Sequence, residues 1–556
     1  MISIRHARLF HSIRSARTNN YFSYTSGRWL FNEQQQLDKR YIEFDIPALQ
    51  RIAGQAVGSR CMKMDKLPEG LFNKVFSLHM ENGKEVLARI PNPNAGHPRY
   101  VVASEVATLD FLRTVLDIPV PRVLSWSSSQ PNPVGAEYIL MERVQGKQLN
   151  EVWDGMAETQ RFGLVKSLVD VERRLVKARF SLHGSLYYRS TLQDTSIGFQ
   201  ADPTVPSEFV FGPTTQRSFW EDGKQALDID RGPCGWHSTL YRNLPSHLTV
   251  PIGRTAQEYL TAVANREIAR VQRLQKSSNV AVPPERIPQS RETHVRLLEQ
   301  FLAVLPHILP PEDTLSPVLL HHDLHPNNIF VDASDHTRIS GIIDWQAVYT
   351  APLFIQAKFP SVFDCDDPYP WGAVQPQLPK DFESLSPAAR EHAESALSRL
   401  RLKKFYELAS RKFNPPLIRA MDKMRNDEDP TTTFIFHILG QSSEDGPVPL
   451  RELLIQIYEK WDWIMQRRGS AIPCPIFFSK TEIDESRQQA EAWADVFADF
   501  ETLRETLLGD DGWVSHEDYD EAMRRWEENK ATLENLKKRL EMILYASILF
   551  AQSVQR

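Results

Sequence analysis

The ten residues HHDLHPNNIF, numbered 321–330, carry more polar side chains than a connecting loop needs. One or two polar groups suffice to cap a loop, but this stretch supplies three histidines, one aspartate and two asparagines before it turns apolar. The surplus lies directly before an expected strand. The pattern therefore predicts a loop that binds or acts on a ligand.

Two expected strands follow this loop and form a hairpin. NIFVD (328–332) and RISGIIDW (338–345) are mainly apolar, and the turn-like ASDHT (333–337) separates them. Antiparallel pairing returns the chain, so the outer ends of the two strands lie side by side. The hairpin therefore predicts that the polar residues flanking its strands converge.

The residues at this predicted edge form an oxygen-rich cluster. Asp323 and Asn328 lie on one side of it, and Asp344 lies on the other. Mg²⁺ prefers oxygen ligands and takes its remaining ligands from phosphates and water. A carboxylate that stays off the metal can accept a hydrogen bond from a hydroxyl nucleophile.

The HHDLHPNN stretch followed by IIDW resembles the catalytic loop and metal-binding segment of the protein-kinase-like superfamily. More specifically, it is similar to the aminoglycoside phosphotransferase and choline-kinase branch. The resemblance implies that Asp323 is the catalytic aspartate and that Asn328 and Asp344 bind Mg²⁺. It also implies that His321 and His325 brace the loop.

An N-terminal region of strands and one helix fits the small nucleotide-binding lobe of the same superfamily. An Asn-Gly pair between two apolar runs is a strong hairpin signal. The expected elements are strands at 71–80 and 85–91, a helix at 99–116, and strands at 118–126 and 135–146.

Glu105 lies on the apolar stripe of the expected 99–116 helix. A carboxylate there is costly unless it is paired; alternatively, Glu105 lies at the edge of the stripe, in water. The resemblance implies pairing with a basic residue on the strand at 85–91. That residue is Arg89, where the superfamily usually has lysine, and arginine is not a neutral replacement at a positioned site.

The resemblance also places the remaining nucleotide contacts. The hinge that contacts adenine through its backbone would comprise Met141, Glu142 and Val144. The phosphate-binding loop is poor in glycine, because only Gly70 precedes LFNKVF. Fewer backbone N–H groups are then available for phosphate.

The expected fold class is α+β: a bilobal protein-kinase-like fold with a small β-rich N-lobe, one key helix and a large, mostly helical C-lobe. The expected divisions are a presequence at 1–40, the N-lobe at 41–145, the C-lobe at 146–480 with an insertion at 190–300, and a helical extension at 481–556.

The N-terminus is rich in arginine and serine, and its first acidic residue is Glu33. This composition is typical of a cleaved mitochondrial presequence, although a disordered basic tail has the same composition. Independently, GLFNKVFSLHM, SEVATLDFLR and GPTTQRSFW look like a fungal subgroup, the altered inheritance of mitochondria proteins. Both features predict a mitochondrial protein.

The bulk composition excludes several other classes. The net charge of −6 does not indicate a nucleic-acid-binding surface. No segment approaches the ~20 apolar residues that span a bilayer. The four cysteines are far apart, which predicts neither a disulfide framework nor a metal site.

Two motifs remain open. FGPTTQRSFW (211–220) resembles a motif of the fungal subgroup, and its favoured role is packing. The acidic FDCDD segment carries Asp364, Asp366 and Asp367, which either line a pocket for a cationic substrate or belong to a solvated loop. The second reading is favoured.

The expected function is transfer of the γ-phosphate from ATP, with Mg²⁺, to the hydroxyl of a small molecule in the mitochondrion. The alternative is a catalytically weak, pseudokinase-like protein that binds nucleotide, or a protein partner through helices 481–556. Arg89 and the glycine-poor loop motivate this alternative. A protein kinase is disfavoured, because WQAVYTAPLF after Asp344 lacks an A-P-E element.

Overall fold

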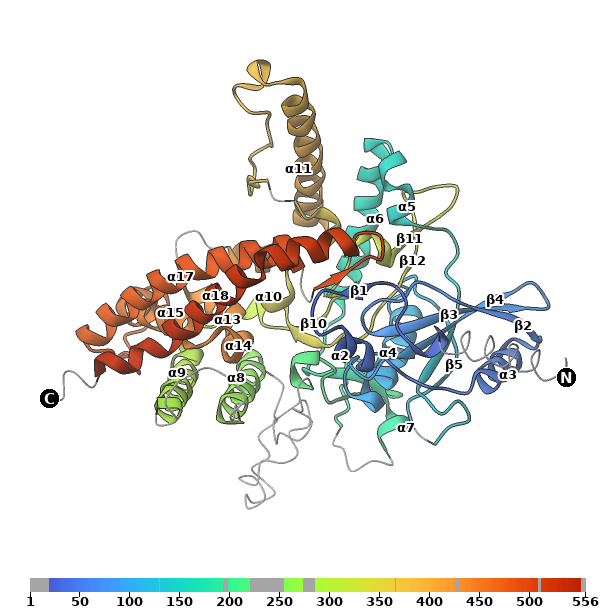
Figure 1. The fold of residues 1–556 in the computed structure, drawn as a ribbon, viewed down its shortest axis with the longest axis horizontal. Helices are drawn as coiled ribbons and strands as arrows, with labels where there is room; N and C mark the ends of the chain where they lie inside the picture. The colour runs from blue at the N-terminus through green and yellow to red at the C-terminus, as the bar shows by residue number, and fades with distance from the viewer. Residues whose placement is uncertain are drawn as a thin grey trace.

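The computed structural model describes residues 20–129, 131–193, 199–220, 255–273, 286–365, 367–425, 431–508 and 512–551. A five-stranded antiparallel sheet near the N-terminus is followed by a mostly helical part (Figure 1). The predicted α+β class, with a small β-rich lobe and a large helical one, is confirmed.

The N-lobe sheet has the strand order β2-β3-β4-β6-β5, with every neighbouring pair antiparallel. The predicted hairpin at 71–91 is β3 and β4. The strands are β2 (Cys61–Lys66), β3 (Asn73–Met80), β4 (Glu85–Pro91), β5 (Val123–Ser127) and β6 (Tyr138–Glu142).

One helix covers each face of this sheet, because successive strand residues point to opposite sides. Leu140 on β6 packs with helix α3 (Ile46–Val57). Its neighbours Ile139 and Met141 pack against helix α4 (Pro98–Thr114). The α4 helix is the one predicted at 99–116, whereas α3 was not foreseen.

Residues 20–45 form an aromatic N-terminal strap over the sheet. The Tyr21 and Phe44 rings both pack against Phe76 of β3, at centroid distances of 5.6 and 5.3 Å. Trp29 is fully buried. Residues 20–40 thus pack as part of the folded chain, and the cleavage expected of a presequence at 1–40 stays a prediction. Residues 1–19 lie outside the described residues, so a presequence there stays a prediction.

The predicted hairpin lies within the C-lobe. Strands β11 (Ile329–Val331) and β12 (Ile339–Ile342) pair as predicted, and β7 (Lys147–Gln148) adds a third strand from the hinge side. Two further pairs are β8 (Ser185–Tyr188) with β9 (Phe209–Gly212) and β10 (Pro317–Leu319) with β13 (Thr350–Pro352).

Helices form most of the C-lobe and share one large apolar core. They are α5 (Leu149–Val152), α6 (Glu158–Lys177), α7 (Arg189–Leu192), α8 (Ala256–Arg273), α9 (Arg286–Ile308), α10 (Leu353–Gln356), α11 (Pro387–Phe413), α12 (Pro415–Met424), α13 (Thr431–Ile438), α14 (Ser442–Asp445), α15 (Pro447–Glu459) and α16 (Trp461–Arg467). A short helix α2 (Glu33–Asp38) lies in the N-terminal strap.

Two long helices close the chain, α17 (Lys480–Leu508) and α18 (Tyr519–Ala551). They lie side by side and extend across the molecule in orange and red (Figure 1). At one end, strand β14 (Trp513–Val514) between them pairs with β1 (Arg28–Trp29) of the strap. The C-terminal helices are therefore joined to the N-terminal strap.

None of the helices in the described part of the chain is long and apolar enough to cross a membrane. Cys61, Cys365 and Cys474 carry free thiols. The fourth cysteine, Cys234, lies outside the described residues.

The burial of Trp29 predicts where the folded protein begins. A chain starting at residue 41 lacks the strap contacts and should lose at least about 3 kcal/mol of unfolding free energy, because removing one buried tryptophan costs that much. A chain starting at residue 20 is the matched control. Equal denaturation curves for the two chains would contradict the structure.

Glu172 on α6 predicts a pH dependence of stability. Burial raises the pKa of this carboxyl to about 8, and the Tyr406 hydroxyl 2.6 Å away only partly opposes the shift. Between its ordinary pKa of 4.5 and 8, the folded chain holds a proton that the unfolded chain releases. Stability from this group is therefore lost as the pH rises.

Glu172→Gln should remove that loss and stabilise the protein by about 3 kcal/mol more at pH 8 than at pH 5. The measurement is denaturant unfolding at both pH values, with the exposed Glu151→Gln as the control. A gain that is the same at both pH values would show that Glu172 is not neutral in the folded protein.

Candidate active site

His321 fixes the backbone of the catalytic loop. Its Nδ1 accepts the N–H of Asp323 at 3.2 Å, and its Nε2–H donates to the carbonyl of Ile343 at 2.9 Å. Burial lowers the pKa of His321, which keeps the ring neutral as this pattern requires. The ring packs edge-on against buried Trp345. His321 thus ties the loop to the end of β12.

Asn328 fixes the loop from its other end. Its Nδ2 donates to the Asp323 carbonyl at 2.9 Å and lies 3.1 Å from His325 Nε2. The amide nitrogen is therefore engaged, which leaves Oδ1 as the atom that can face a cation. His325 Nε2 also lies 3.4 Å from Asp323 Oδ2. The Asp323 side chain nevertheless stays 64% exposed, so a substrate can reach it.

Arg89 and Glu105 form the predicted pair across the N-lobe. Two guanidinium nitrogens lie 2.7 Å from the two Glu105 oxygens, a bidentate arrangement. Glu105 is 2% exposed, and burial raises its pKa to about 7 while Arg89 opposes the shift. Arg89 Nη2 also approaches Asp344 Oδ1 at 3.3 Å. One arginine therefore links the helix, the sheet and the predicted metal ligand.

The turn that carries Asp344 is held in an unfavourable backbone conformation. Asp344 and Ala347 have φ values of 63° and 59°, in the left-handed region that costs a non-glycine residue about 1–2 kcal/mol. Gln346 between them forms two reciprocal amide hydrogen bonds with Asn73 of β3, at 2.9 and 3.0 Å. This contact between the lobes holds the turn in place, and sequence reasoning did not find it.

The predicted hinge packs against the predicted catalytic hairpin. Met141 and Glu142 end β6, and Val144 packs against Gly341 of β12, where an added Cβ would collide with it. Gly146 has a φ of 111° and leaves no room for a Cβ beside the Val331 carbonyl. These close contacts restrict the backbone conformation of the hinge. Its contact with adenine stays a prediction.

Ion pairs and a hydrogen bond from neighbouring side chains hold the predicted phosphate loop in place. Gly70 is exposed, and no atom lies near an added Cβ, so packing does not require glycine there. Beside it, buried Glu69 pairs with Lys66 at 2.7 Å and with Lys74 at 3.1 Å. The Leu71 carbonyl accepts Arg40 Nε at 3.2 Å. Side chains thus hold a loop that has few glycines.

The donor set fits Mg²⁺ only together with a phosphate. Asn328 Oδ1 and the Asp344 carboxylate are two oxygen donors of the type that Mg²⁺ takes with substrate phosphates. Within the described residues, no group of three His, Cys, Asp or Glu side chains could hold a metal ion by itself. The remaining ligands would have to come from a nucleotide and water.

The motif FGPTTQRSFW does more than pack within the C-lobe. Trp220 contacts His97 and Tyr100 at the start of α4, at centroid distances of 4.7 and 5.4 Å. The Arg217 guanidinium lies 3.4 Å over the Phe72 ring, next to the phosphate loop. The sequence marked this motif as distinctive, but its contacts with the N-lobe come only from the fold.

The acidic FDCDD segment is tied to α11. Asp367 pairs with Arg399 at 3.1 Å. Asp364 is exposed, and Asp366 lies outside the described residues. The charge of Asp367 is therefore already compensated.

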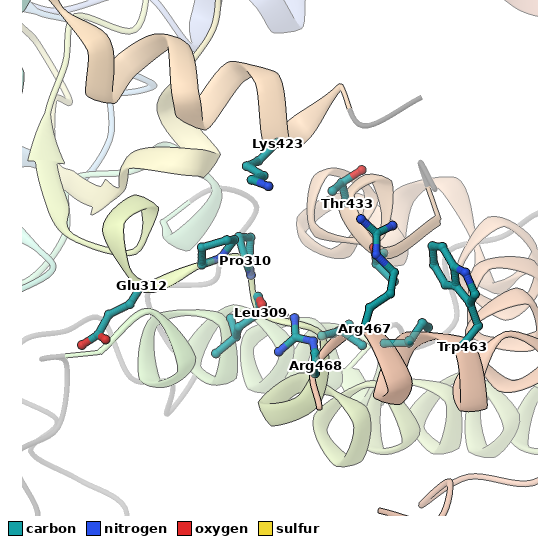
Figure 2. Close-up of a pocket in the computed structure, with 12 residues that line it drawn as sticks. Leu309, Pro310, Glu312, Lys423, Thr433, Trp463, Arg467 and Arg468 are labelled. Atoms are coloured by element: carbon teal, nitrogen blue, oxygen red, sulfur yellow. Dashed lines mark hydrogen bonds between the residues drawn. The ribbon is translucent and has the colours of Figure 1, made fainter. Parts of the chain in front are cut away.

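A hollow of about 460 Å³ lies apart from these residues (Figure 2). Its wall comes from the end of α9 and from α12, α13 and α16, with Lys423, Arg467, Arg468 and Trp463 among its lining residues. None of the predicted site residues lines it. It is not the predicted catalytic site.

Comparison with known proteins identifies a family and several relatives. The family model described as "Phosphotransferase enzyme family" matches residues 64–354. A subtelomeric hrmA-associated cluster protein of Aspergillus fumigatus is 32% identical over 78% of this chain and 85% of its own length. A solved aminoglycoside phosphotransferase, a thermostable mutant with AMP-PNP and hygromycin B, is 14% identical over 74% of this chain and 97% of its own, with a TM-score of 0.30.

Altered inheritance of mitochondria protein 9 of Saccharomyces cerevisiae is 23% identical over 90% of this chain and 87% of its own length. The predicted resemblance to this fungal subgroup is confirmed as a distant similarity. The matched family model covers both the N-lobe sheet and the catalytic hairpin. The chain therefore belongs to the aminoglycoside phosphotransferase (APH) family of phosphotransferase enzymes, with its protein-kinase-like fold.

Proposed function

We propose that this protein transfers the γ-phosphate of ATP to the hydroxyl group of a small molecule. The proposal depends on one observation: Asp323 has a fixed backbone and an exposed carboxylate. Its backbone is fixed by hydrogen bonds with His321 and Asn328, whereas its carboxylate is exposed to solvent. A carboxylate held in this way can orient an acceptor hydroxyl without rearrangement.

The reaction needs little covalent chemistry from the protein. The acceptor oxygen attacks the γ-phosphorus, the bond from that phosphorus to the ADP oxygen breaks, and Asp323 accepts the hydroxyl proton. Catalysis then depends on position and on compensation of the phosphate charge. His325 Nε2, 3.4 Å from Asp323 Oδ2, helps to keep the carboxylate in place.

Asn328 and Asp344 are proposed to hold Mg²⁺, which when bound would neutralise charge on the phosphates. Arg89 now lies 3.3 Å from Asp344 and is paired with Glu105. It can therefore position phosphate oxygens from the N-lobe side, as the superfamily's lysine does. Gly70 and the hinge residues Met141, Glu142 and Val144 are proposed to contact the nucleotide.

The proposed location is the mitochondrion. It is supported by the arginine-rich N-terminus and by the distant yeast relative, whose name includes "mitochondrial". The proposed domain limits are an N-lobe up to residue 145, a C-lobe to 480 and the helical extension beyond it. The α17 and α18 helices match that extension.

A second candidate is a nucleotide-binding protein with little or no catalysis. The observation that favours it is the N-lobe side of the site, where Arg89 replaces lysine and the phosphate loop has one exposed glycine. In this case, the C-terminal helices would bind a protein partner. The two candidates differ in what Asp323 does.

Thermal unfolding tests the metal–nucleotide site. ATP and Mg²⁺ together should stabilise the full chain, by about 2.7 kcal/mol when ATP·Mg is at a hundred times its Kd. Mg²⁺ alone should have little effect, since the chain supplies only two oxygen donors. Asp344→Asn should abolish the joint shift, whereas Asp364→Asn, at an exposed aspartate, should keep it. No shift with millimolar ATP and Mg²⁺ would contradict ATP·Mg binding.

Asp323→Asn distinguishes the two candidates. The variant should bind ATP and Mg²⁺ like the wild type but release ADP at least about 100-fold more slowly with a panel of hydroxyl compounds, because it has lost its general base. Asp335→Asn, an exposed aspartate in the hairpin turn, is the control. An unchanged rate in Asp323→Asn would favour the non-catalytic candidate.

A further inference from the structure

The turn that contains Asp344 depends on side chains for its conformation. Asp344 and Ala347 both lie in the left-handed backbone region, with φ values of 63° and 59°. Within the described residues, no backbone N–H from 344 to 347 donates to a backbone carbonyl. A turn of non-glycine residues in this region persists only where surrounding contacts hold it.

On the C-lobe side, the turn is held at Trp345. Its indole N–H donates to the Ile342 carbonyl at 3.1 Å, and its ring packs edge-on against His321. These contacts fix the residue that follows Asp344. The next residue, Gln346, makes its side-chain hydrogen bonds with the other lobe.

Two neighbouring strands of the N-lobe contact this turn. Arg89 of β4 approaches the Asp344 carboxylate at 3.3 Å. The carboxylate oxygen nearest to it, Oδ1, is buried and accepts no hydrogen bond. Asn73 of β3 exchanges two amide hydrogen bonds with Gln346, at 2.9 and 3.0 Å. The arginine thus attracts the carboxylate by charge, whereas the amide pair provides the directional contact between the N-lobe and the turn.

The amide pair has the geometry needed to fix a position. Gln346 is 8% exposed, and each amide both donates to the other and accepts from it. A shift of either side chain would leave a buried donor or acceptor unsatisfied, which is costly. Asn73 is the third residue after Gly70. The pair therefore connects the end of the predicted phosphate loop with the turn of the predicted metal ligand.

We propose that Asn73 and Gln346 are positioning residues for Asp344. Their amide pair keeps the turn in the strained conformation that places Asp344 beside Arg89, so that binding of ATP with Mg²⁺ depends on contact between the two lobes. The inference rests on the proposed Mg²⁺ site and assigns to it two residues that do not touch the metal.

Two variants remove the amide groups and keep the approximate size of the side chains, Gln346→Met and Asn73→Leu. Gln466→Met, at an exposed glutamine on α16, is the matched control. Melting curves show whether each variant is folded. The double variant Asn73→Leu/Gln346→Met leaves neither amide without its partner, and it replaces a single variant that does not fold.

Hydrogen exchange of the nucleotide-free full chain tests whether the pair holds the turn. The amides of Ile342 and Ile343, at the end of β12, donate to the carbonyls of Pro119 and Asn328. Exchange in the peptide 341–349 should be at least about tenfold faster without the amide pair, because local opening of the turn then costs less free energy. The control variant should exchange like the wild type.

The second measurement is the Mg²⁺ concentration that gives half-maximal thermal stabilisation at saturating ATP. Each single variant should need about tenfold more Mg²⁺ than the wild type, because releasing one residue from the left-handed region is worth about that factor. Both substitutions remove the same contact, so the double variant should need no more Mg²⁺ than the more impaired single variant.

Three results would overturn the inference. An unchanged Mg²⁺ requirement in folded variants would show that the pair does not position Asp344. Additive effects in the double variant would show that the two residues act separately. Unchanged exchange across 341–349 would show that other contacts hold the turn. If the wild type does not respond to ATP and Mg²⁺, the proposed function fails instead, and the exchange measurement, which needs no ligand, still tests the amide pair.

Discussion

The ion pair between Arg89 and Glu105 is the contact on which the arrangement of the site depends. A carboxylate buried at 2% exposure on an apolar helix face is tolerated only when it is paired. The bidentate contact therefore fixes α4 against β4. The same guanidinium approaches Asp344. The position of the N-lobe helix and the position of the predicted metal ligand are thus set by one side chain, whose charge is permanent.

The C-lobe side of the site is rigid for a different reason. The side chains of His321 and Asn328 form hydrogen bonds with the backbone of the predicted catalytic loop. The Asn73–Gln346 amide pair holds the strained turn that contains Asp344. The Asp323 carboxylate is the most exposed of the predicted site's carboxylates, at 64%, against 41% for Asp344. Such a combination suits phosphoryl transfer, which depends on positioning and charge more than on covalent chemistry.

Contacts outside the two lobes reach the phosphate loop as well. The Thr25 N–H of the strap donates to Glu69 at 2.6 Å, directly before Gly70. The same strap pairs through β1 with β14, between the two C-terminal helices. The C-terminal extension is therefore connected through hydrogen bonds to the loop that is proposed to hold phosphate. This connection gives the strap a structural role that its composition did not indicate.

The sequence by itself predicted the polar loop and its hairpin, since motif spacing is a local property of the chain, and the family resemblance implied the Arg89–Glu105 pair, which the structure shows. The structural role of the strap escaped it, because a basic, serine-rich start has the composition of a presequence. Only the tertiary structure placed Arg217 over the Phe72 ring and paired Asp367 with Arg399. These contacts join segments far apart in the chain, and no local pattern encodes which distant side chains meet. The sequence therefore predicted which residues form the candidate site, and the fold decided which distant side chains surround them.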